Sequence, residues 1–186
     1  MAKEKYKKKI LELFEKSPIV NYNSIKRIIK NPGYAKQLIR NLILKNKIKK
    51  ITKGFYTIRD DPSLAVYCFK PAYLGLQDAL SIHELWEQET IPIIVTQRRV
   101  RPGLRKVNET NILLRRINKK YLFGFDYIKQ GNLYFPYSDI EKTFIDMIYF
   151  KEKLDSETLK NIKIKINKEK LRKYLKIYPK KIRKRV

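Results

Sequence analysis

Turn-forming residues recur at short intervals through the first sixty positions, and this spacing limits the fold of that region more than any other feature. The turns are Ser17-Pro18, Asn31-Pro32-Gly33 and Thr52-Lys53-Gly54. Proline fixes φ and glycine tolerates positive φ, so each group ends or interrupts a regular element. The segments between these turns must therefore form short elements.

Apolar residues in the first three segments recur at helical spacing, which predicts three amphipathic helices. These helices are expected over residues 4–15, 24–29 and 34–45. Asn23 or Ser24 is expected to cap the second helix, and residues 48–58 predict a two-stranded hairpin. Two helices, a turn, a third helix and a hairpin follow the order of a winged helix-turn-helix. Residues 1–60 are therefore predicted to be a DNA-binding domain of this class.

In such a domain the third helix enters the major groove of duplex DNA and the hairpin, or wing, lies beside the phosphate backbone. Arg40 and Gln37 have the geometry to read base edges, whereas lysines suit phosphates as point charges. The predicted DNA-binding residues are Tyr34, Lys36, Gln37, Arg40, Asn41, Lys49, Lys50 and Lys53. Winged helices also serve as protein-interaction modules, and that alternative stays open.

The formal net charge is +26, which favours a polyanionic partner, either nucleic acid or an anionic membrane. Residues 1–59 carry 17 basic and 3 acidic side chains, residues 60–150 carry 12 and 11, and residues 151–186 carry 15 and 4. No apolar run approaches the roughly 18 residues of a membrane span, so we expect no membrane partner and a cytoplasmic location. A single cysteine excludes an intrachain disulfide and a cysteine zinc site.

Asp60-Asp61-Pro62 breaks the hairpin and marks a predicted boundary, after which residues 61–155 are expected to form a small α/β domain. The overall prediction is an α+β protein: a winged helix-turn-helix, this domain and a basic, partly helical extension over 156–186. The helices expected in the second domain are 76–86 and 139–154. The strands expected there are 91–96, 111–117, 121–125 and 133–137.

Three motifs in order resemble the AbiEi family, the DNA-binding antitoxins of abortive-infection toxin–antitoxin systems. They are TKGFYTI at 52–58, YLGLQDALSIHEL at 73–85 and IEKTFIDMI at 140–148. The resemblance covers roughly residues 10–150, and Glu84 stands where many relatives have a small residue. It implies an autoregulatory repressor that binds inverted repeats in its own promoter. Whether the protein binds as a homodimer or as monomers side by side stays open. The resemblance also implies a cognate nucleotidyltransferase-like toxin as a second partner.

Candidate catalytic groups are few. His83, the one histidine, is expected to be a packed structural residue on its helix. The acids most available for metal chemistry are Asp126, Asp139, Glu141 and Asp146. Their spacing in the sequence does not match that of the acidic residues in a metal-dependent nuclease. Glu141 is expected to cap the helix that begins near Asp139. No phosphate-cradling loop or activated nucleophile is readable, so we predict no catalytic residues, no metal and no cofactor.

Two further basic groups are candidate phosphate contacts outside the first domain. They are Arg98, Arg99 and Arg101 in the segment RRVRPGLRK, and Lys180, Lys181 and Arg183 in the tail. The first group fits a phosphate contact, a docking patch or a solvated loop. The predicted function is a sequence-specific repressor and antitoxin. The alternatives are a non-specific architectural nucleic-acid-binding protein and, less favoured, a metal-dependent nuclease.

Overall fold

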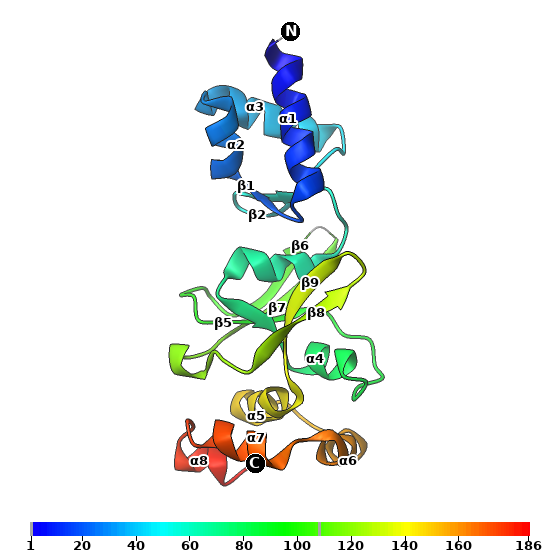
Figure 1. Cartoon of the computed structure of the whole chain (residues 1–186), viewed down its shortest axis with the longest axis vertical. Helices are drawn as coiled ribbons and strands as arrows, with labels where there is room; N and C mark the ends of the chain where they lie inside the picture. The colour runs from blue at the N-terminus through cyan, green and yellow to red at the C-terminus, as the bar shows by residue number, and fades with distance from the viewer. Residues whose placement is uncertain (1, 108) are drawn as a thin grey trace. The chain divides into compact units, whose positions relative to one another are not determined.

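The computed structural model describes residues 2–107 and 109–186, and the protein is of the α+β class with two β-sheets (Figure 1). The chain divides into two compact units. The first unit contains the chain up to Cys68 together with 106–110, and the second contains 69–105 and 111–186. In the part of the chain that the structure describes, no helix has both the length and the apolar character needed to cross a bilayer.

Three helices and a small sheet make up most of the first unit. Their bounds are α1 Ala2–Lys16, β1 Val20–Asn21, α2 Tyr22–Ile29, α3 Pro32–Leu44, β2 Lys49–Thr52 and β3 Phe55–Thr57, followed by the 3-10 helix η1, Pro62–Phe69. The sheet order is β1-β3-β2, and both pairings are antiparallel. The three helices and the β2–β3 hairpin were expected, but the short strand β1 was not.

The helix starts differ from the predicted ones for a local reason. Asn21, rather than Asn23 or Ser24, caps α2, because its side-chain oxygen accepts a hydrogen bond from the Ser24 N–H at 2.8 Å. Asn31 caps α3 in the same way through the Tyr34 N–H at 2.9 Å, so Pro32 begins the helix. Proline suits a first helical turn because its missing N–H has no intrahelical acceptor there.

The core of the first unit is formed by the apolar stripes that the sequence predicted. Ile10 and Phe14 of α1, Ile25 of α2 and Leu42 of α3 are each at most 1% exposed. Ile48, just before β2, is equally buried in the same cluster. This packing holds α3 by its apolar face and directs the opposite face outward.

The second unit contains a six-stranded mixed sheet, except for the strand residues Lys106, Val107 and Thr110, which are grouped with the first unit. Its elements are β4 Ala72–Leu74, α4 Gln77–Ile82, β5 Ile93–Thr96, β6 Gly103–Val107, β7 Thr110–Arg116, η2 Lys119–Tyr121, β8 Phe125–Gln130, β9 Leu133–Ser138, α5 Ile140–Phe150, α6 Ser156–Lys165, α7 Lys168–Leu175 and α8 Lys180–Arg183. The strand order is β6-β7-β5-β4-β9-β8, with β4–β9 and β5–β7 parallel. Figure 1 shows α5 between this sheet and the C-terminal helices.

Three predicted elements of this unit need correction. The helix expected over 76–86 ends at Ile82, because Glu84 adopts a left-handed conformation with φ of 57° and Leu85 N–H bonds back to Leu80. Residues 121–125, expected as a strand, are mostly an irregular link between η2 and β8. The basic segment after Arg101, expected as a connection, forms the edge strand β6.

A buried ionic network lies between the sheet and the C-terminal helices. Lys142 and Asp146 of α5 form an ion pair with both side chains 0% exposed. The Tyr73 hydroxyl of β4 donates to Asp146 at 2.5 Å and accepts from Lys142 Nζ at 2.8 Å. Burial lowers the pKa of Lys142 and raises that of Asp146, and their attraction opposes both shifts. The network therefore holds two buried charges in place by mutual pairing.

Residues 156–186, expected as an extension, contribute to this core. Tyr178 is 2% exposed and stacks on Tyr121 with ring centroids 4.3 Å apart. The Tyr174 hydroxyl donates to Asp139 at 2.7 Å, and burial together with this bond raises the pKa of Tyr174 to about 12. Glu141 accepts from the Asn167 N–H at 2.7 Å, whereas Asp139 caps α5, which corrects the expected role of Glu141.

Candidate nucleic-acid interface

The exposed face of α3 is a single stripe of side chains at helical spacing. Its exposed members are Lys36, Gln37, Arg40, Asn41 and Leu44. Ala35, Leu38, Ile39 and Leu42 are buried on the opposite side. A spacing of three and four residues places the exposed side chains on one face. The first unit therefore presents four polar side chains and one leucine along α3.

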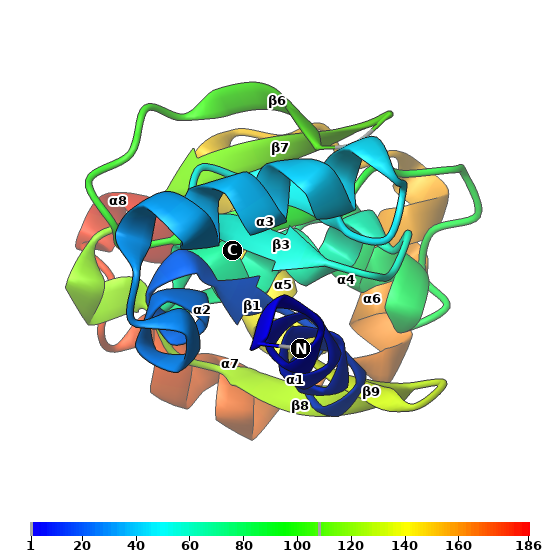
Figure 2. The same cartoon turned by 90° about the horizontal axis from the view of Figure 1, so that it is seen from above.

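The β2–β3 hairpin lies beside this helix (Figure 2). It adds basic residues to the lining of the same surface. Lys50 on β2 and Lys53 in the turn are exposed. The turn depends on Gly54, whose φ of 79° is a conformation that side chains other than glycine rarely adopt. The structure brings these lysines, which follow α3 closely in the sequence, back beside its exposed stripe.

A hollow of about 460 Å³ lies between α3 and the hairpin. Four cations line it: Lys36, Arg40, Lys50 and Lys53. Its other lining residues are Tyr22, Ile39, Ile43, Leu44, Gly54 and Tyr56. Among the residues that the structure describes, no carboxylate forms an ion pair with any of these four cations. The hollow therefore combines four cations with a largely apolar lining.

Two predicted binding residues are held by the first unit itself. Lys49 is half-buried and its ammonium pairs with Asp60. Tyr34 is half-buried and meets Tyr6 edge-on with ring centroids 6.2 Å apart. Of the eight predicted residues, Gln37 and Asn41 are exposed on the α3 stripe but do not line the hollow.

The sequence analysis did not predict the apolar lining of this hollow. Tyr56 is half-buried, and partial burial with Tyr22 nearby raises the pKa of its hydroxyl. Leu44 is 71% exposed. Its position four residues after Arg40 and seven after Gln37 was the available signal, because that spacing places a leucine on the predicted polar face.

The other predicted phosphate contacts belong to the second unit and line no part of this hollow. Arg98, Arg99 and Arg101 are exposed in the segment before β6. Arg101 also accepts, through its carbonyl, a hydrogen bond from Arg105 at 2.9 Å. Lys180, Lys181 and Arg183 are exposed on α8.

The residues considered for catalysis do not form one site: each is exposed by itself or bonded to another group. His83 is half-buried and its Nε2 lies 2.7 Å from the Ser138 carbonyl oxygen. Asp126 is exposed on β8, and Asp146 is in the buried network. Within residues 2–107 and 109–186, no group of three or more His, Cys, Asp or Glu side chains is arranged to hold a metal ion.

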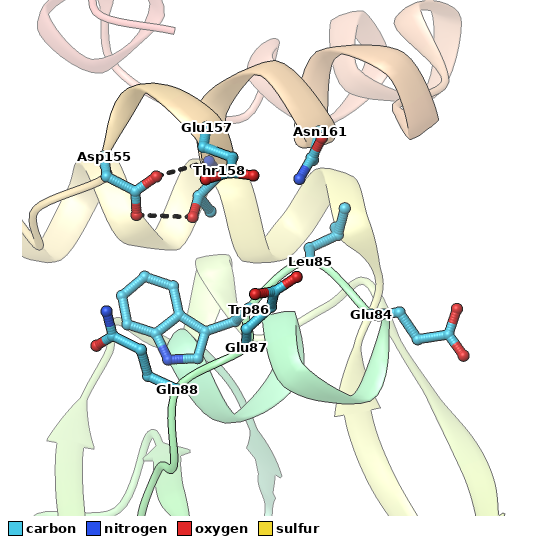
Figure 3. Close-up of a pocket in the computed structure, with 9 residues that line it drawn as sticks. All are labelled: Glu84, Leu85, Trp86, Glu87, Gln88, Asp155, Glu157, Thr158 and Asn161. Carbon is cyan, nitrogen blue, oxygen red and sulfur yellow. Dashed lines mark hydrogen bonds between the residues drawn. The ribbon is translucent and has the colours of Figure 1, made fainter.

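A second hollow, of about 180 Å³ and in the second unit, has the opposite charge (Figure 3). Glu84 and Glu87 approach it from the segment after α4, and Asp155 and Glu157 from the start of α6. Asp155 accepts from the Thr158 N–H at 2.7 Å and from its hydroxyl at 2.8 Å, which lowers the pKa of the carboxyl. Four carboxylates repel phosphate, so this hollow does not suit nucleic acid.

No protein-family model matches the sequence, and no curated protein shows significant similarity to it. The chemistry of the first unit's surface therefore carries the functional inference.

Proposed function

We propose that the first unit is a winged helix-turn-helix that binds double-stranded DNA through α3 and the β2–β3 hairpin. The observation that carries the proposal is the convergence of Lys36, Arg40, Lys50 and Lys53 around one hollow. Cations that no carboxylate neutralises provide the sequence-independent attraction on which DNA affinity largely depends. A surface helix presenting arginine, glutamine and asparagine on one face suits insertion into the major groove.

The residues take separate roles in this proposal. Gln37, Arg40 and Asn41 contact base edges, because their side chains offer the paired donors and acceptors that such contacts need. Lys36, Lys50 and Lys53 contact phosphates. Tyr34, which packs on Tyr6, and Lys49, which pairs with Asp60 at the surface, lie outside the hollow.

We further propose that the protein is a transcriptional repressor of its own promoter and the antitoxin of a nucleotidyltransferase-like toxin. The ordered motifs at 52–58, 73–85 and 140–148 support this role through their resemblance to AbiEi antitoxins. A reporter under the promoter of its own gene should fall when the protein is expressed, and recover with Arg40→Ala. Co-expression with the product of the adjacent gene tests the antitoxin role.

Base discrimination should depend on Arg40 more than on the hairpin lysine Lys53. Arg40→Ala is expected to cost about 1–3 kcal/mol on the preferred sequence and to reduce the preference over random duplex. Lys53→Ala should weaken binding to both duplexes alike. Fluorescence anisotropy with the two duplexes measures this, and Lys163→Ala, an exposed cation on α6, controls for net charge. An Arg40→Ala protein with full preference would contradict the recognition-helix assignment.

Affinity for duplex DNA should fall steeply with salt because binding releases counterions. The log–log slope is expected to be about −0.9 for each phosphate contacted. Removing Lys36, Lys50 and Lys53 together should make the slope shallower by roughly 2.7. Titrations between about 50 and 200 mM salt give both slopes. An unchanged slope in the triple variant would place the phosphate contacts elsewhere, and equal affinity for promoter and random duplex would favour an architectural role.

A further inference from the structure

The hollow between α3 and the hairpin contains more apolar surface than phosphate binding requires. Ile39, Ile43, Tyr22 and Tyr56 line it together with Leu44, whose side chain is 71% exposed. A single exposed leucine needs no explanation. Here, however, five apolar side chains from α2, α3 and β3 line one hollow together with four cations. This combination favours an occupant that is anionic overall and carries apolar groups.

Duplex DNA has both properties at one place. Its phosphates match the charge of the four cations that line the hollow. The C5-methyl of thymine is the apolar group on the base edges of the major groove. Adenine, guanine and cytosine carry no methyl group on their major-groove edges, where they present hydrogen-bond donors and acceptors. An apolar surface facing that groove therefore distinguishes thymine from the other bases.

The position of Leu44 fits a base-edge contact. It lies one turn beyond Arg40 on the same exposed stripe, a rise of about 6 Å along the helix. Because stacked bases are about 3.4 Å apart, this rise corresponds to at most about two base steps along the duplex. We propose, on the basis of the DNA-binding function above, that Leu44, with the partly exposed apolar side chains of the hollow beside it, reads thymine methyl groups. The preferred duplex then contains A·T pairs within about two base steps of the base read by Arg40.

Uracil in place of thymine removes the methyl group and keeps every hydrogen-bonding atom, so it isolates this contact. A preferred duplex is first selected with the full-length protein from a randomised pool, then synthesised with thymine or with deoxyuridine in the enriched positions. Wild-type protein should bind the uracil duplex roughly fourfold more weakly for each methyl contacted, the factor expected for burying one methylene-sized group. Anisotropy titrations at fixed salt give the ratio of the two dissociation constants.

Three variants test whether Leu44 is responsible for the ratio of the two dissociation constants. Leu44→Ala should bring it close to one, and Leu44→Met, which keeps an apolar side chain, should preserve most of it. Lys53→Ala should weaken binding to both duplexes and leave the ratio at its wild-type value. Leu44 is mostly exposed, so its replacement leaves the core intact.

The outcomes separate this inference from the function on which it rests. A protein that binds no duplex overturns the proposed function. Equal binding of both duplexes by the wild-type protein overturns only the proposed contact with thymine methyl groups. The apolar part of the hollow would then contact another partner, such as an anionic lipid or a protein. A uracil penalty that is unchanged in Leu44→Ala, or an enriched sequence without A·T pairs, also overturns the proposed contact.

Discussion

Replacing Lys142 with alanine is expected to lower the free energy of unfolding of the second unit by about 3–5 kcal/mol. The substitution leaves Asp146, which is 0% exposed, without its ion-pair partner, and removes the donor to Tyr73. A buried carboxylate without compensation destabilises the folded state strongly. Trp86, the single tryptophan, lies in the second unit, so its fluorescence during urea unfolding reports on this unit.

A matched double variant separates the loss of pairing from the loss of packing. Lys142→Met combined with Asp146→Leu removes both charges and keeps apolar volume, so it should be far more stable than Lys142→Ala. If Lys142→Ala shifts the Trp86 transition by less than about 1 kcal/mol, the ion pair does not have the energetic role that its burial indicates.

Gly124→Ala is expected to lower the free energy of unfolding of the same unit by about 2–5 kcal/mol. Gly124 has φ of 69°, and an added Cβ would lie 2.9 Å from Lys142 Cβ and 2.9 Å from a ring carbon of Tyr174. The left-handed conformation costs about 1–2 kcal/mol for a residue with a side chain. Crowding against α5 and α7 adds about 1–3 kcal/mol.

Gly131→Ala is the control for the conformational part of that cost. Gly131 has φ of 57°, and nothing lies within 4 Å of the position of its Cβ. Its substitution should cost only about 1–2 kcal/mol. Equal losses in the two variants, measured by Trp86 fluorescence, would show that α5 and α7 move aside without cost.

The first unit was predictable because its signals are local. Helical spacing and the turn groups located α1, α2, α3 and the hairpin, since each depends on residues close in sequence. The cap of α2 was displaced because Asn21 precedes two other polar candidates, Asn23 and Ser24, and only the backbone geometry selects between them. The sequence analysis predicted all four cations that line the hollow: Lys36, Arg40, Lys50 and Lys53.

The second unit was less predictable because its structure depends on distant pairings. The neighbours β4 and β9 are joined through Leu74 and Tyr137, which no local pattern relates. The strand β6 reads as a basic connection because most of its side chains are exposed. The apolar hollow of the first unit was missed for a related reason: Tyr22, Leu44 and Tyr56 come from three elements, and only the tertiary fold assembles them.

The stacking of Tyr178 on Tyr121 has a consequence during protein synthesis. The apolar cluster that joins the three helices of the first unit contains no residue later than Tyr56, so it can form while the rest of the chain is being translated. The core that begins at Tyr73 lacks one of its largest buried side chains until Tyr178 has emerged from the ribosome. A nascent chain therefore completes the packing that holds α3 before its ionic centre is enclosed.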